Sequence, residues 1–129
     1  MSPTSSTLSQ DGAAERVVPA ADWRTFLDEV AVEMAGLPVA IEVRRRERMT
    51  RMAARGVLHA LLYDVRDDVI EIAVQTPTSG RVAVMRHLIA RPARVVADAA
   101  GLAPATVVVQ GADGDVTRLR ILPSPAFSG

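Results

Sequence analysis

The order of apolar and polar residues divides this chain into one helical segment followed by a series of short strands. Within Trp23–Pro38, apolar side chains recur every three or four positions, which is the repeat of one helix face. Gly36 can take the left-handed conformation after the last turn, and Pro38 cannot continue a helix. The pattern predicts a helix that buries Trp23 and Phe26 in the core.

After this helix, apolar residues alternate with polar ones over short runs separated by Gly, Pro and Asp. One run, Met52–Tyr63, also fits a short helix. Strands do not alternate with helices, so the sheet is expected to be antiparallel. We predict an α+β domain with one N-terminal amphipathic helix on a curved, mostly antiparallel sheet or small barrel of about six or seven strands. The predicted strands are Leu37–Val43, Met52–Tyr63, Val69–Gln75, Arg81–Leu88, Ala93–Ala97, Thr106–Gln110 and Val116–Ile121.

The last two strands form the best-specified hairpin. Their loop, 111–114, ends in Asp-Gly, the preferred centre of a two-residue type I′ turn. This turn would pair Val109 with Arg118 and Val107 with Arg120. Both valines are therefore predicted on the outer face, where arginine stems can cover them.

Length and composition predict a single domain over residues 17–122. Residues 1–16 are small and polar, and we expect a disordered tail there and a flexible C-terminal tail over 123–129. No apolar run is long enough to span a bilayer, so no membrane association is expected. The absence of cysteine excludes disulfides, thiolate zinc sites and a cysteine nucleophile, and it fits a cytoplasmic protein.

All fifteen basic residues are arginine, and fifteen acidic residues balance them. A basic segment could contact phosphates or an acidic protein, or serve only as a solvated connection. Neutral overall charge argues against a dedicated nucleic-acid binder, and no aromatic residue for base stacking lies within the segment. Its six arginines are Arg44, Arg45, Arg46, Arg48, Arg51 and Arg55.

No set of residues in the sequence predicts catalysis, a bound cofactor or a metal site. The two histidines, His59 and His87, lie on different predicted strands without acidic residues at ligand spacing. Phosphate-binding loops, nucleophile elbows and dinucleotide fingerprints are absent from the chain. We therefore predict a protein that is not an enzyme.

Several short motifs occur in one order along the chain. They are WxxFLDE at Trp23–Glu29, PVxIEV at Pro38–Val43, ARGVL at Ala54–Leu58, VIEI at Val69–Ile72, HxIxxPxxV at His87–Val95 and DGxVTxLR at Asp113–Arg120. This series resembles a family of small bacterial proteins known only as a domain of unknown function. The resemblance covers about residues 17–122. It implies a single domain, and it implies no activity, cofactor or site residue.

The leading functional prediction is a non-catalytic module that binds another protein or itself, as a homo-oligomer. Its candidate contact residues are Val32, on the polar side of the helix, with Val107 and Val109. One alternative is RNA binding through the Arg44–Arg55 segment. Another is a small-ligand site in a barrel mouth, with His87 or Tyr63 as its polar group.

Overall fold

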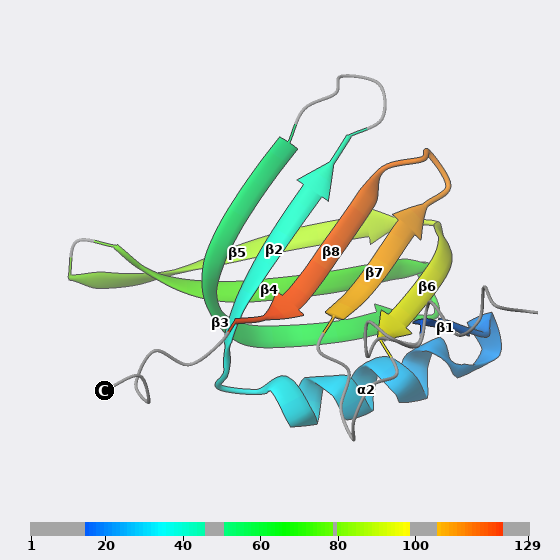
Figure 1. Ribbon diagram of the computed structural model, residues 1–129, viewed down its shortest axis with the longest axis horizontal. Coiled ribbons are helices and arrows are strands. Elements are labelled where there is room, and N and C mark those ends of the chain that lie inside the picture. Colours follow the sequence, from blue (N-terminus) through cyan, green and yellow to red (C-terminus); the bar gives the residue numbers. More distant parts are fainter. Residues whose placement is uncertain (1–14, 46–50, 79, 99–105, 123–129) are drawn as a thin grey trace, which may run out of the picture.

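The computed structural model describes the chain over residues 15–45, 51–78, 80–98 and 106–122. Within these ranges it contains one α-helix, α2 (Trp23–Met34), which follows a single 3₁₀ turn, η1 (Ala20–Asp22). Eight strands make one sheet (Figure 1). They are β1 (Glu15–Val18), β2 (Pro38–Arg44), β3 (Arg51–Asp64), β4 (Val69–Thr78), β5 (Arg81–Ala90), β6 (Pro92–Asp98), β7 (Thr106–Gly111) and β8 (Val116–Ile121).

The predicted helix is confirmed. Trp23 and Phe26 are buried, as the apolar stripe requires. The indole N–H of Trp23 donates to the carbonyl of Val18 at 2.9 Å, which ties the start of the helix to β1. Gly36 has a φ of +79°, and the chain leaves the helix there to enter β2.

The sheet is open and antiparallel, in the order β1-β6-β7-β8-β2-β3-β4-β5, so β1 and β5 are its two edges. It has one strand more than the six or seven expected. The additional strand is β1, which pairs Val18 with Val95 and Glu15 with Asp98. It begins at Glu15, two residues before the predicted start of the domain. This strand has only four residues, ERVV, and it is too short to show a clear alternation of polar and apolar positions in the sequence.

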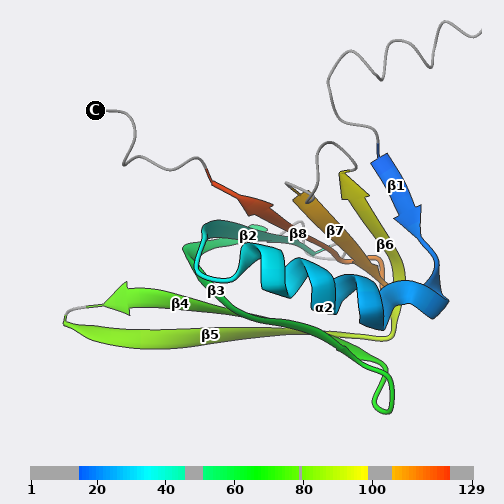
Figure 2. The same cartoon turned by 90° about the horizontal axis from the view of Figure 1, so that it is seen from below.

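The sheet folds over on itself because β3 is long and bent. A bulge between Leu58 and Ala60 shifts its pairing with β4. At Gly56, a Cβ atom would lie 2.2 Å from the carbonyl oxygen of Gln75, so only glycine allows this close approach. The two parts of the sheet lie on either side of α2, which occupies the space between them (Figure 2). Inward-facing aliphatic side chains from both parts make up the core with the helix.

The register of the β7–β8 hairpin differs from the prediction by one residue. Val107 lies opposite Leu119, and Val109 lies opposite Thr117. Only Gly114 in the turn has a positive φ, whereas a type I′ turn needs two such residues. The loop is therefore longer than two residues, and the shift of one residue exchanges the two faces of β7. The faces of β8 are unchanged, with Leu119 inward and Arg118 and Arg120 outward.

The predicted outer location of Val107 and Val109 is consequently wrong. Each is 1% exposed and belongs to the core. Neither side chain can contact a partner.

Candidate functional site

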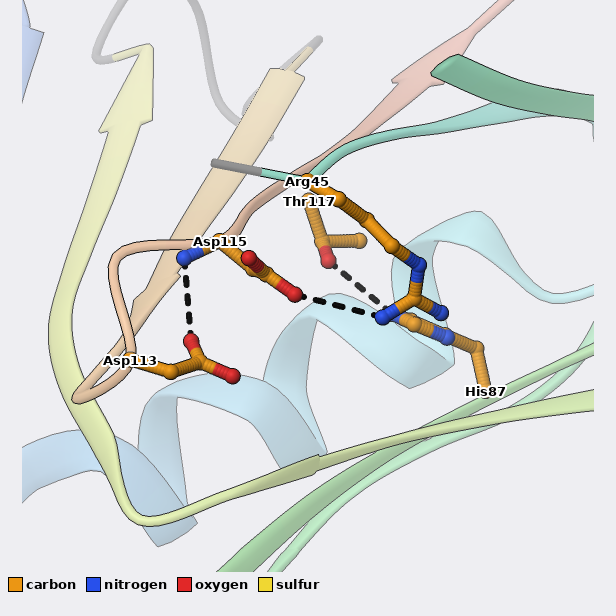
Figure 3. Close-up of polar contacts among 5 residues, drawn as sticks. All are labelled: Arg45, His87, Asp113, Asp115 and Thr117. Atoms are coloured by element: carbon orange, nitrogen blue, oxygen red, sulfur yellow. Dashed lines mark hydrogen bonds and ion pairs between the residues drawn. The ribbon is translucent and has the colours of Figure 1, made fainter. Parts of the chain in front are cut away.

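A cavity of about 240 Å³ lies between the end of β2, the second half of β5 and the turn joining β7 to β8. We call it the His87 pocket. Its walls contain aliphatic residues of β2 and β5 and a group of polar side chains, most of which Figure 3 shows. The polar residues are Arg45, His87, Arg91, Asp113, Asp115 and Thr117.

His87 and Thr117 connect the two parts of the folded sheet across the interior. His87 Nε2 and Thr117 Oγ1 are 3.0 Å apart (Figure 3). Thr117 is 2% exposed and is the only buried polar residue in the described part of the chain. Its hydroxyl needs a partner there, and the imidazole provides one.

Burial lowers the pKa of His87 below its ordinary value of 6.5, and the positive charge of Arg45 lowers this pKa further. The carboxylate of Asp115 opposes these two effects in part. The imidazole is therefore neutral at neutral pH, and it can both donate and accept a hydrogen bond.

Arg45 forms the outer wall of the pocket through an ion pair with Asp115 at 3.2 Å. Asp113 fixes the turn below this pair, because its Oδ1 accepts a hydrogen bond from the backbone N–H of Asp115 at 2.9 Å. Arg91, at the corner between β5 and β6, has a φ of +51°. Its backbone N–H donates to the carbonyl of Asp68, and its carbonyl accepts from the N–H of Ala112.

The pocket holds two arginines and two aspartates, so its formal charge is zero, and it could hydrogen-bond a small neutral or zwitterionic molecule. The pocket also holds a hydroxyl–imidazole pair, in which Thr117 is 2% exposed, so a substrate would have to reach a buried hydroxyl. The described residues contain no group of three His, Cys, Asp or Glu that could hold a metal ion.

Tyr63 does not line the His87 pocket. Its hydroxyl donates to Asp68 Oδ1 at 2.6 Å, and its ring meets the ring of Trp23 edge-on at 5.4 Å. The hydrogen bond to Asp68 raises the pKa of Tyr63. The sheet of the described residues is open, so it forms no barrel mouth of the kind predicted for His87 or Tyr63.

The predicted basic segment is partly outside the described residues, which exclude Arg46, Arg48 and the side chain of Arg51. Arg45 points to the His87 pocket, whereas Arg44 and Arg55 are exposed on the outer face of the sheet. Two further exposed arginines, Arg118 and Arg120, project from β8 beside them. We call Arg44, Arg55, Arg118 and Arg120 the arginine face.

The outer face of β3, β4 and β5 has a different character. Five of the nine large apolar side chains that are exposed in the described residues lie on it. The most exposed are Val82 at 67% and Leu88 at 60%. We call this surface the apolar face; its members are Val57, Leu62, Val82, Val84 and Leu88. Val32, the predicted contact on the helix, is 76% exposed and lies outside this face.

The sequence did not predict the apolar face or the pocket partners Thr117 and Asp115. The alternation Val82, Val84, Leu88 could have indicated one apolar side of β5. The pocket contacts join residues 70 and 30 positions apart, and no local pattern carries that information.

The fold defines a small α+β domain in which one helix fills an open, folded antiparallel sheet. Within the described residues, no helix has the length and apolar character needed to cross a bilayer. The profile of a family described as "Family of unknown function (DUF5335)" matches residues 14–125, and the chain belongs to this family. This confirms the resemblance to a domain of unknown function. No curated protein and no solved structure matched the chain.

Proposed function

We propose that the protein is a non-catalytic interaction module that forms a homodimer, with the apolar faces of two copies packed against each other. The observation that carries this proposal is the concentration of exposed valine and leucine on one outer face of the sheet. Exposed apolar side chains gathered on one face of a protein are typical of interaction sites, and two sheet faces can pack closely when their side chains interdigitate.

The charges of the apolar face favour a second copy of the same chain. A two-fold interface brings the same surface of each copy together, so an unpaired charge on that surface would lie near the same charge of the other copy and repel it. On this face Arg86 is already paired with Glu71 of the same chain, at 3.0 Å from Nη2 to Oε2. The arginine face, in contrast, would place like charges opposite each other in such a dimer.

The proposal includes a cytoplasmic location and no membrane partner. A chain without cysteine is compatible with a reducing compartment. No bound cofactor is part of the proposal.

Light scattering coupled to size-exclusion chromatography tests the proposal. We expect twice the monomer mass for the unmodified protein and the monomer mass for the double variant Val82→Glu/Val84→Glu. Val32→Glu introduces the same charge at an exposed valine outside the apolar face, and it should remain dimeric. Far-ultraviolet circular dichroism checks that the variants keep their fold. A monomeric unmodified protein, or dissociation caused by Val32→Glu alone, would rule out this interface.

A further inference from the structure

We infer that the arginine face binds the phosphate backbone of double-stranded nucleic acid. The face is the exposed outer side of three neighbouring strands, β8, β2 and β3, whose opposite side packs on the core. The sequence pointed only to the Arg44–Arg55 segment. The sheet adds two arginines from the far end of the chain.

The strand register sets the positions of these arginines. Arg55 and Arg120 both lie opposite Ala40, one on each side of it, and Arg118 lies opposite Glu42 one row further along. Rows on one face of a strand are about 7 Å apart, and strands two apart are separated by about 10 Å. The arginines are thus distributed over the face rather than collected at one point.

The arginine face carries a positive charge although the formal net charge of the whole chain is zero. Four arginines stand against one carboxylate, Glu42, which leaves a formal charge of +3. On the same outer side of the sheet, Glu15 and Asp98 lie beyond β7, at the β1–β6 edge. Another acidic group lies on the exposed side of α2 and consists of Asp28, Glu29 and Glu33. The neutral sum therefore does not exclude binding to a polyanion.

The residues between the arginines favour phosphate over a protein or bases. Protein interfaces usually centre on a buried aromatic or large aliphatic side chain. The centre of this face has only Ala40 and Glu42. Single-strand binding needs aromatic rings for stacking, but the described aromatic residues, Trp23, Phe26 and Tyr63, belong to or pack on the core. One guanidinium group can donate two parallel hydrogen bonds to the oxygens of a phosphate. We therefore expect these arginines to contact the nucleic-acid backbone without reading the bases.

Fluorescence anisotropy with a labelled DNA duplex of arbitrary sequence tests the inference. Each phosphate contact contributes about −0.9 to the slope of log K against log salt. Four contacts predict a slope of about −3.6, and Arg55→Gln/Arg120→Gln should reduce its magnitude by about 1.8. Arg55→Lys/Arg120→Lys keeps the charge and should retain most of the salt dependence.

The matched control is Arg24→Gln/Arg66→Gln, which removes the same charge from exposed positions outside the face. It should leave the slope unchanged. An equal reduction of the salt slope in Arg55→Gln/Arg120→Gln and in Arg24→Gln/Arg66→Gln would overturn the inference. So would the absence of duplex binding at low salt. A polyglutamate competitor tests the other class of partner. If it displaces the duplex from the unmodified protein at equal charge concentration, an acidic protein is the better ligand and the inference fails.

Discussion

Replacing Val109 by Ala tests the register of the β7–β8 hairpin, on which the position of the His87 pocket depends. Val109 is 1% exposed, whereas its neighbour Val108 is half-buried on the outer face. The change removes two methylene equivalents, worth about 0.8 kcal/mol each, and leaves a cavity in the core. We expect Val109→Ala to lower the free energy of unfolding by about 2 to 3 kcal/mol. Val108→Ala should lower it by less than about 1 kcal/mol.

Urea denaturation followed by the fluorescence of Trp23 measures both values. The two variants carry the same chemical change on adjacent residues of one strand, so the loss of strand propensity is similar in each. The difference between their free energies of unfolding therefore reports how deeply each valine is buried. In the register expected from a type I′ turn, Val108 would be buried and Val109 would face outward. A larger effect for Val108→Ala would therefore refute the structure of this hairpin.

Three further substitutions test the fold and the pocket. The pKa of His87 is lower in the folded protein than in the unfolded chain. As the pH falls below about 6.5, the unfolded chain therefore binds more protons at this residue than the folded protein does, and the free energy of unfolding decreases. The stability advantage of the unmodified protein over His87→Gln, measured by urea denaturation, should shrink between pH 7.5 and 5.5; an advantage that grows would contradict the neutral imidazole. Gly56→Ala should destabilise by about 3 kcal/mol, because its Cβ would meet the backbone oxygen of Gln75; a thermal midpoint equal to that of the unmodified protein would exclude the close approach. Trp23→Phe should cost about 1 to 2 kcal/mol, because the carbonyl of Val18 loses its indole donor; an unchanged urea midpoint would show that this hydrogen bond contributes nothing.

The parts of the fold predicted from sequence are those that depend on local pattern. The stripe from Trp23 to Met34 and the stop at Gly36 predict the helix within a residue or two. Alternation likewise predicts most strands, because each buries one side against the same core. These features need no knowledge of which segments meet in space.

The parts that sequence reasoning missed depend on geometry between distant segments. Loop length in the last hairpin depends on the φ of a single residue, and this reversed the predicted faces of Val107 and Val109. The contacts of His87 with Thr117, and of Arg45 with Asp115, exist because β3 folds the sheet over. The bulge and Gly56 that permit this bend are weak signals in a sequence, since an isolated glycine in a strand has several structural uses.

Distance measurement between two labels tests the proposed dimer most directly. The chain has no cysteine, so Val84→Cys and Val32→Cys each give a single site for a nitroxide spin label. Double electron–electron resonance on each labelled dimer reports the distance between the two copies of that site. Packing of the apolar faces predicts a short distance between labels at residue 84 and a longer one at residue 32. A distance between labels at residue 84 that is longer than the distance at residue 32, or no dipolar coupling at either site, would contradict the proposed dimer.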